Sequence, residues 1–592
     1  MILQALTRYY EALLKRGDIA PLGWSKTKIS FALCLDKDGH VTQVIPTMEP
    51  VEMGKKTVLR PQEKNLPAGE DRSSNVAANF LWDNSGYILG IDQKGKPERS
   101  KKYFSEAKAL HHAVLDGVNS PTSSAILAFF DAWQPERAAE HPALASQLQA
   151  ITSGGNLLFR VDGVYPQEDT AICDAWQRYW ERTDKNAKLM QCLVTGQYHQ
   201  EIARTHPKIK GDPRDGFQTM GNTLVSFNND SESSYGQEQS YNAPVGKYAA
   251  FAYTAALNHL LANRNNVQII GDTTVVCWAE GAEPVYQDLF MSFVSGRLPP
   301  AISDNDLRAA LKRLAMGLPC DDLGVDPNRT FYVLGLAPNA ARLSVRFFLR
   351  DSFGKLMQNV NAHYERLEIA GANNRTIPIW KLLDTTVRDP KKQVPAPNMA
   401  GATTRAIFEG TPYPTSLMAA VVLRIRAELK VTRERAAILK AYIQKNYISR
   451  AHDNDRKNKL AEVAQVQLNE RCDYMPYVLG RLFRVMEEIQ LASADWKLNR
   501  TIKDSYFNTA ASTPKNAFCK LFPLSSYHLK KLMRDKPGLG KKLGDLESKL
   551  IAKLTSPIPA RFTQEETNCF YIGYDHQENT HFSIIKYSNK VY

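Results

Sequence analysis

FYVLGLAPNAARLSVRF, residues 331 to 347, holds two largely apolar runs separated by a short break. FYVLGL and ARLSVRF contain the β-branched and aromatic residues that favour strands, and the break supplies the Pro-Asn pair typical of a turn. The stretch therefore predicts a β-hairpin. The residues after it predict a helix over 352–369, which closes the mixed α/β part of the chain.

Upstream of this hairpin, helical and strand patterns alternate irregularly. An Asp-Gly pair at 38–39, between two apolar runs, is a further hairpin signal. The predicted elements are a helix within 1–17, a hairpin of strands 29–35 and 41–45, a strand at 87–92, helices at 101–117, 121–134 and 141–151, a strand at 157–161, a helix at 245–262, a hairpin of strands 267–270 and 274–278, and two further helices.

The segment 390–414 differs from its surroundings because prolines occur at 390, 395, 397, 412 and 414. Proline-rich stretches mark domain boundaries, and almost only helical patterns follow, including one helix over about 415–448. The sequence thus predicts an α+β N-terminal region of mixed sheets and helices, residues 1–395, followed by an all-α C-terminal helical bundle, residues 396–592.

The composition indicates a globular protein that associates with polyanions. Of 592 residues, 43% are apolar, and 75 Lys and Arg against 62 Asp and Glu give a formal charge of +13. Eight scattered cysteines form no CxxC pair, so we expect reduced, buried thiols. The N-terminal pattern is that of an amphipathic helix, and no apolar run reaches the roughly 20 residues of a membrane span. We expect a cytoplasmic protein with no membrane contact.

The positive charge is concentrated in the C-terminal third. Residues 421–460 carry eleven Lys or Arg against four acids, and residues 513–554 carry ten against three. Cations on helix faces are usually only solvated, and those that bind nucleic acid contact backbone phosphate with little dependence on sequence. The period of 3.6 residues places one stripe of cations beside the apolar face of the predicted helix 415–448. These are Arg426, Lys430, Arg433 and Lys440.

Two polar segments of the N-terminal region are suited to duplex DNA. Residues 51–75 are basic and predict a flexible loop or an edge strand, and residues 204–244 form a polar stretch too long for an ordinary connection. Lys and Arg bind phosphates, whereas Asn, Gln and Ser can read base edges. For each segment taken alone, the composition favours a solvated surface loop, and for the second segment the alternative is a flexible Asn-rich insertion.

The sequence contains no pattern that predicts catalysis. The nearest approach to a phosphate-binding GxxxxGK loop is Gly540-Lys541, and it fails because Asp535 and Lys542 stand where Gly and Ser or Thr are needed. We interpret His452-Asp453 as solvated loop residues rather than metal ligands. The same interpretation applies to Asp575-His576 and to His111-His112, which lies on a predicted helix. No HExxH or nucleophile-elbow pattern occurs. We therefore predict no enzyme activity, no cofactor and no metal.

Five features of the chain carry a resemblance to a known family. They are the opening helix, NFLWDNSGYILG at 79–90, LVSFNNDSESSYGQEQSYNAP at 224–244, the 331–347 stretch and the basic helical tail. Together they resemble the large subunit of type I-C CRISPR interference complexes, the Csd1-like subunit of Cascade. In such complexes guide RNA reads the target by base pairing, while protein reads a short adjacent duplex motif.

The resemblance implies a subunit that recognises this motif in double-stranded DNA, helps to open the duplex, stabilises the R-loop and helps to recruit a helicase-nuclease. The implied partners are CRISPR guide RNA, target double-stranded DNA, the backbone and handle-binding subunits of Cascade, and that helicase-nuclease. It also implies a small subunit made from an internal start in the same reading frame. Met475 and Met486 are candidate starts, because each begins a helical run.

Physical reasoning, rather than residue-by-residue matching, gives the candidate contacts. Amide groups beside aromatic rings suit grooves and unstacked bases, and clustered cations suit phosphates. For the adjacent motif and duplex, the candidates are Lys55, Lys56, Arg60, Arg72, Ser73, Asn75, Asn228, Tyr235, Gln237 and Asn242. For the displaced strand or other backbone contacts, they are Arg426, Lys430, Arg433, Lys440, Lys530, Lys531, Arg534, Lys541 and Lys542.

Two alternatives remain open. A metal-dependent nuclease or RNA-processing enzyme of the same system would need metal ligands, or a catalytic His, near basic residues. A scaffold whose basic tail binds acidic proteins would need no nucleic acid at all. Incubation with labelled RNA and DNA in magnesium distinguishes the first alternative, and gel shifts with competitor polyanion distinguish the second.

Overall fold

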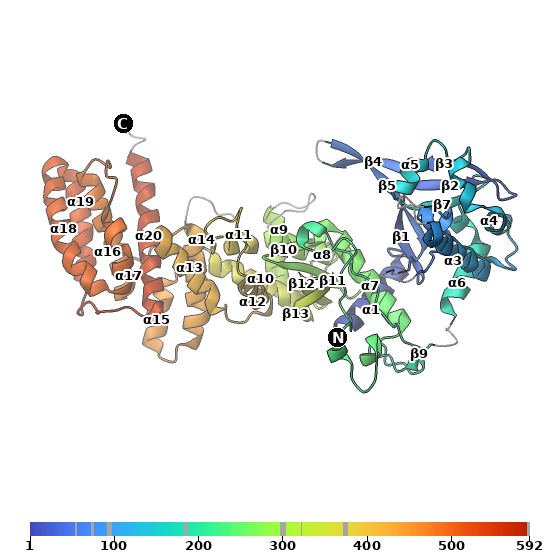
Figure 1. Cartoon of the computed structure of the whole chain (residues 1–592). Coiled ribbons are helices and arrows are strands. Elements are labelled where there is room, and N and C mark those ends of the chain that lie inside the picture. Colours follow the sequence, from blue (N-terminus) through green and yellow to red (C-terminus); the bar gives the residue numbers. More distant parts are fainter. Residues whose placement is uncertain are drawn as a thin grey trace. The chain divides into compact units, whose positions relative to one another are not determined.

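The computed structural model describes residues 1–53, 56–70, 72, 76–91, 97–182, 187–295, 304–320, 323–370 and 377–588 (Figure 1). The chain divides into two compact units. The first comprises Met1–Gly211 and Gln218–His259, and the second comprises Asp212–Phe217 and Leu260–Tyr592. Within the described residues, no helix combines the length and the apolar character that crossing a membrane requires.

The first unit is built on two sheets. One has the order β3-β2-β7-β6, with β2 parallel to β7 and the other pairs antiparallel, and the other is the antiparallel sheet β1-β5-β4. The strands are β1 Trp24–Ile29, β2 Phe31–Leu35, β3 Val41–Pro46, β4 Met48–Met53, β5 Lys56–Pro67, β6 Trp82–Asp83, β7 Leu157–Val161, and the short pair β8 Leu189–Met190 and β9 Gln200–Glu201. The helices are α1 Ile2–Arg16, α2 Ser85–Ile88, α3 Pro97–Leu115, α4 Pro121–Ala132, α5 Leu148–Ser153, α6 Thr170–Glu181 and α7 Lys247–Ala262.

An aromatic core fills the space between the β2–β7 sheet and its helices. Phe80 stacks on Trp176 with ring centroids 5.1 Å apart, and His111 of α3 lies 4.5 Å from Phe130. His111 Nδ1 lies 2.7 Å from the Ala107 carbonyl oxygen, and its Nε2 accepts the Leu81 N–H at 3.0 Å. Burial lowers the pKa of His111 to about 4, so this histidine is neutral and structural.

The second unit begins with an antiparallel sheet of order β10-β11-β12-β13. Its strands are β10 Gln268–Ile270, β11 Thr273–Ala279, β12 Thr330–Asn339 and β13 Arg342–Ser352. The last two form the hairpin predicted from residues 331–347. A Cβ at Gly335 would lie 2.6 Å from the Phe347 ring, so glycine is required at this point of the hairpin.

Helices make up almost all of the chain after this sheet, as predicted for the C-terminal region. The central helix α16 contacts α17, α18, α19 and α20. The helices of the second unit are α8 Pro284–Ser295, α9 Asp304–Ala315, α10 Phe353–Leu367, α11 Ile379–Asp384, α12 Pro397–Glu409, α13 Thr415–Glu428, α14 Arg433–Tyr442, α15 Asn454–Val463, α16 Met475–Ser493, α17 Ile502–Ser512, α18 Pro514–Asp535, α19 Pro537–Ala552 and α20 Gln564–Ser588.

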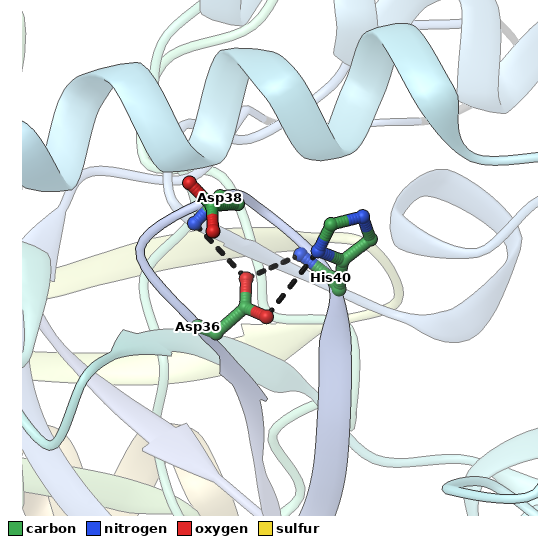
Figure 2. Close-up of side chains that lie close together, drawn as sticks. All are labelled: Asp36, Asp38 and His40. Atoms are coloured by element: carbon green, nitrogen blue, oxygen red, sulfur yellow. Dashed lines mark hydrogen bonds and ion pairs between the residues drawn. The ribbon is translucent and has the colours of Figure 1, made fainter.

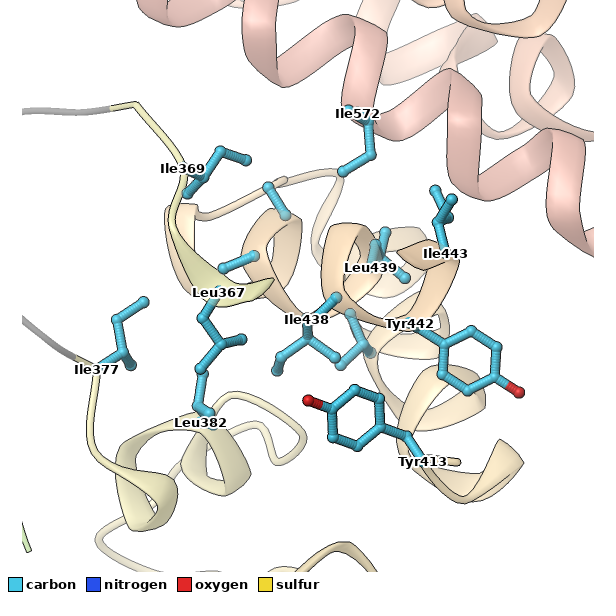
Figure 3. Close-up of a cluster of buried hydrophobic side chains, with 14 of the residues drawn as sticks. Leu367, Ile369, Ile377, Leu382, Tyr413, Ile438, Leu439, Tyr442, Ile443 and Ile572 are labelled. Carbon is cyan, nitrogen blue, oxygen red and sulfur yellow. The ribbon is translucent and has the colours of Figure 1, made fainter. Parts of the chain in front are cut away.

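One hydrophobic core runs through the second unit, from Ile270 of the sheet to Tyr574 of α20. Figure 3 shows a part of it, in which side chains of α10, α11 and α14 meet beneath Ile572. Because sheet and helices share this core, the division into compact units falls near residue 260, and the predicted boundary at 395/396 lies within the second unit. The latter marks a change of secondary structure, and as a domain boundary it stays a prediction.

Three predicted elements are wrong in type or extent. No strand forms over 87–91: Tyr87 and Ile88 belong to α2, because Asn84 caps this helical turn by accepting the Gly86 N–H, and residues 89–91 are turn or irregular backbone. Asp92, the last residue of the predicted strand, lies outside the described residues. The predicted helix 415–448 is two helices, since Leu429 has the left-handed φ of +51° and Thr432 caps α14. In addition, regular helix in 141–151 is confined to the start of α5.

A close contact between α16 and α20 yields a stability prediction. A Cβ at Gly480 would lie 2.0 Å from the Phe570 carbonyl oxygen, and one at Gly573 would lie 2.2 Å from that of Tyr477. Gly480→Ala must therefore push α16 and α20 apart, and we expect a loss of about 3 kcal/mol in the free energy of unfolding. Thermal unfolding followed by circular dichroism measures it.

Gly538→Ala on α19 is the matched control, because a Cβ there would meet nothing within 4 Å. We expect no destabilisation, and at most a gain of about 1 kcal/mol from helix propensity. Equal unfolding midpoints for the two variants would show that the α16–α20 contact tolerates a methyl group.

Candidate nucleic-acid interface

The basic segment 51–75 is largely a β-hairpin rather than a flexible loop. Strands β4 and β5 pair from Met48↔Pro61 to Met53↔Lys56, and β5 continues to pair with β1. Arg60 is exposed on β5, opposite Glu49. Lys56 lies at the start of β5, and Lys55 lies outside the described residues. The hairpin therefore presents Arg60 on a paired strand.

Arg72 is used inside the first unit. Its guanidinium makes two hydrogen bonds to the carboxylate of Asp83, one of 2.9 Å to Oδ1 and a second, shorter one to Oδ2, and lies 4.0 Å from the centroid of the Tyr87 ring. Asp83 is 1% exposed and also accepts the N–H groups of Asn79 and Asn84. Burial raises the pKa of Asp83, and the Arg72 hydrogen bonds offset part of that rise.

This arrangement corrects the interpretation of Arg72 as a loop residue free to bind DNA. A buried carboxylate without its cation is costly, so the pair is held together by the fold. Sequence reasoning missed it because Asp83 lies eleven residues away, in NFLWDNSGYILG. Ser73 and Asn75, the other candidates beside Arg72, lie outside the described residues.

The polar stretch 204–244 is an ordered loop that its own side chains hold. Asn242 Oδ1 accepts the Ser234 N–H at 2.7 Å, and its Nδ2 donates to the carbonyl oxygens of Gln237 and Gln239 at 3.1 and 2.9 Å. Both ends of the Asn242 amide are thus committed to the loop. Asn242 therefore holds the loop together by these three hydrogen bonds, an arrangement called here the Asn242 brace. This corrects its interpretation as a base contact.

The other candidates of this loop are more accessible. Tyr235 is fully exposed and has the left-handed φ of +52°, in a turn that the Asn242 brace closes. Asn228 is exposed, and its N–H donates to Glu232 at 2.7 Å. Gln237 accepts a hydrogen bond from the Lys188 ammonium through Oε1. Tyr235 is therefore the most prominent candidate on this loop.

The predicted cationic stripe of 415–448 is divided between surface and interior. Arg426 and Lys430 are exposed, and Arg433 is half-buried. Lys440 is 1% exposed, and its ammonium donates to the Arg366 carbonyl oxygen at 2.9 Å. Burial lowers the pKa of Lys440 to about 8. Lys440 is an internal anchor, which corrects its assignment as a backbone contact.

The cations of α18 and α19 lie on the surface as predicted. Lys530, Lys531, Lys541 and Lys542 are exposed, and Arg534 is exposed but paired with Asp535 at 2.8 Å. Tyr527, which sequence reasoning missed, is 68% exposed and lies one helical turn before Lys530 and Lys531. Because Tyr527, Lys530 and Lys531 stand at positions i, i+3 and i+4 of one helix, the sequence spacing already places the ring beside the two cations. An exposed aromatic ring beside cations suits an unstacked base as well as phosphate.

One group of possible metal ligands lies at the turn between β2 and β3 (Figure 2). One oxygen or nitrogen from each of Asp36, Asp38 and His40 fits within 4.8 Å. Asp36 Oδ1, however, accepts the N–H groups of Asp38 and His40 at 3.0 and 2.8 Å, and the His40 bond is the main cause of the lowered pKa of Asp36. Formation of the hairpin turn explains this cluster.

The histidine pairs discounted from the sequence take different places. Asp453 caps α15 and His452 is exposed beside it, as the solvated-loop interpretation requires. Asp575 and His576 are buried in α20, where His576 Nδ1 lies 3.0 Å from the Tyr477 hydroxyl. For them the solvated-loop interpretation is wrong, because the 3.6-residue period turns both toward neighbouring helices.

Residues 6–582 match the model of a family described as "CRISPR-associated protein (Cas_Csd1)". No curated protein matches the chain.

The Arg72–Asp83 pair yields a prediction that separates a structural from a DNA-binding role. Arg72→Ala leaves the Asp83 carboxylate buried without its cation, so we expect a loss of about 3 kcal/mol in the free energy of unfolding. The double variant Arg72→Ala with Asp83→Asn should recover part of this loss. Lys37→Ala, at an exposed cation of the β2–β3 turn, is the control and should leave stability unchanged. A stable Arg72→Ala protein would contradict the structural role.

Proposed function

The chain belongs to the Cas_Csd1 family of CRISPR-associated proteins, and from this membership we propose that it is the large subunit of a type I-C Cascade complex. The single observation that carries the proposal is the extent of the family match, from residue 6 to residue 582. In this role the chain binds guide RNA and target double-stranded DNA. Its protein partners are the backbone and handle-binding subunits, and a helicase-nuclease that it helps to recruit.

The first unit is proposed to read the target-adjacent motif. Guide RNA supplies sequence recognition along the target, so protein contacts are needed only for the short neighbouring duplex. The braced loop carrying Tyr235 and Gln237, together with Arg60 of the β4–β5 hairpin, offers the aromatic, amide and cationic groups that such a duplex requires. An exposed ring of this kind suits insertion between base steps, which aids duplex opening.

The basic helices of the second unit are proposed to hold the displaced strand in the R-loop. Lys530 and Lys531 of α18 and Lys541 and Lys542 of α19 are exposed and belong to one helical hairpin. These cations would bind phosphate, so binding should weaken steeply with salt.

We propose that the subunit breaks no bonds itself. Catalysis by a metal-dependent nuclease, the main alternative, would require convergent ligands, and among the described residues the cluster at Asp36 is explained by its turn. Incubation of the purified chain with labelled RNA and DNA in the presence of Mg²⁺ tests this directly. Cleavage that EDTA abolishes would favour the nuclease.

Motif reading and phosphate binding are separable by mutation. In the complex assembled with guide RNA, Tyr235→Ala and Gln237→Ala should relax the preference among duplexes randomised beside the target, because base contacts carry specificity. Lys-to-Gln changes at 530, 531, 541 and 542 should weaken every sequence alike. They should also lower the slope of log affinity against log salt by about one unit for each phosphate that is no longer bound.

Lys37→Gln serves as the control for charge removal, since Lys37 is an exposed cation outside the candidate sites. If Tyr235→Ala and Gln237→Ala leave motif preference intact, these residues do not read the motif. If the four Lys-to-Gln changes behave like Lys37→Gln, the tail does not bind the strand.

The second unit also favours one of two internal start positions for the proposed small subunit. Met475 is the first residue of α16, so a chain beginning there keeps α16 to α20 complete. Met486 lies inside α16 and is 1% exposed. A chain beginning there would lack Gly480 and the buried rings of Tyr477 and Phe483. A folded small subunit therefore requires the earlier start.

Substitution of each methionine tests this choice. In cells that express the C-terminally tagged chain, Met475→Leu should abolish a short tagged product on an immunoblot, and Met486→Leu should leave it unchanged. Leucine preserves apolar volume and helix propensity at both positions, so the full-length chain should persist. A short product that survives Met475→Leu, or no short product from the parent chain, would refute an internal start at Met475.

A further inference from the structure

A groove in the second unit lies outside every surface assigned above. It has a cavity volume of about 530 Å³ and is lined by residues of the edge strand β10, the helix α11 and the segment 390–395, with Ser295 at the end of α8. This size is within the usual range for sites that bind small molecules or single groups of a larger ligand.

The groove holds a large aromatic ring at its surface. Trp380 of α11 is 41% exposed, and its indole N–H donates to the Ser295 carbonyl oxygen at 3.3 Å. The hydrogen bond fixes one edge of the indole, while much of the side chain stays accessible. Val394, 66% exposed, and the buried Leu383 extend the apolar lining. A fixed aromatic ring with apolar neighbours suits the face of a planar ligand.

Polar groups lie beside this apolar lining. The carboxylate of Asp384 is half-buried, and burial raises its pKa. Gln393 accepts the Arg388 N–H through Oε1 at 3.2 Å, and no hydrogen bond to another described residue occupies its NH₂ group. The groove thus offers acceptors at Asp384 and donors at Gln393. This combination suits a nucleobase edge that presents both donors and acceptors.

A hydrogen-bonded basic turn joins two parts of the groove wall, Pro390 and Gln393. Asp389 Oδ1 accepts the Lys391 N–H at 3.1 Å, and the Asp389 carbonyl oxygen accepts the N–H groups of Lys392 and Gln393 at 3.0 and 2.8 Å. Arg388, Lys391 and Lys392 are exposed on this turn. Three cations against one acid on the turn favour an anionic ligand over a cationic peptide.

We propose that this groove binds one unpaired nucleotide, with its base stacked on Trp380, its polar edge at Asp384 and Gln393, and its phosphate at Lys391 and Lys392. Duplex DNA does not fit this description, because its base faces are covered by stacking. The nucleotide could belong to guide RNA or to displaced DNA, which offer the same base and phosphate groups. The inference rests on the proposed function and adds a site for unpaired nucleotides to it.

Photochemical crosslinking of the full chain tests the site directly. The probes are single-stranded DNA and RNA of equal length carrying 5-iodouracil, and a DNA duplex carrying the same label. We expect crosslinks from the single strands in the peptide that contains Trp380, and none from the duplex. Crosslinking by RNA alone identifies guide RNA as the source, and crosslinking by DNA alone identifies displaced DNA. Crosslinks only at other peptides, or none, overturn the proposal.

Substitutions complete the test. Trp380→Ala should weaken crosslinking at this peptide about five- to hundredfold, as expected for the loss of one stacked base, whereas Trp380→Phe should retain most of it. Trp496→Ala is the matched control, because Trp496 is 46% exposed in the α16–α17 connection. Trp496→Ala should leave crosslinking at the Trp380 peptide unchanged. An equal loss in Trp380→Ala and Trp496→Ala overturns the proposal.

The outcome is independent of motif reading in the first unit. Duplex binding by Trp380→Ala should equal that of the parent chain, so loss of the single-strand site leaves the proposed function intact. A parent chain that binds neither duplex nor single strands would contradict the proposed function itself.

Discussion

The second unit depends on the close contact between α16 and α20. Two glycines, Gly480 and Gly573, allow each helix to approach the backbone of the other at distances where any side chain would collide. Because the helices lie so close, the residues that flank the glycines are buried as well, including the aromatic rings of Tyr477 and Phe570. The remaining helices of the bundle pack against this pair. Among them, α18 and α19 contact α16 and carry the exposed cations.

The same contact explains why α16 can carry charges in the interior. Arg481 donates to Gln577 of α20 at 2.9 Å, and the Tyr574 hydroxyl donates to Glu487 at 2.8 Å. A buried charge is tolerated only when partners replace the water that it loses. Here the partners come from α20, and Lys503 of α17 adds a hydrogen bond to Tyr574 at 2.7 Å. The polar network thereby fixes which helices pair, in addition to the apolar core.

Charged and polar residues that look alike in the sequence divide into two groups in the structure. Arg72, Asn242 and Lys440 are committed to internal partners, whereas Tyr235, Tyr527 and Lys391 stay accessible. The cost of moving a charge or an amide from water explains this division, because any such group that enters the interior must find a partner there. Only the side chains that stay accessible are therefore candidates for binding another molecule.

The amino-acid sequence by itself determined the local elements, among them the hairpin at 331–347, the helices 101–117 and 121–134, the helical C-terminal region and the concentration of cations there. Periodicity and turn residues act over a few positions, so they can be read along the chain. Tertiary structure decided the break at Leu429, the use of Arg72 and Lys440 as anchors, the brace at Asn242 and the groove at Trp380. These depend on partners distant in sequence or on how a loop closes, and whether a polar side chain faces water or another residue is settled only when the chain has packed.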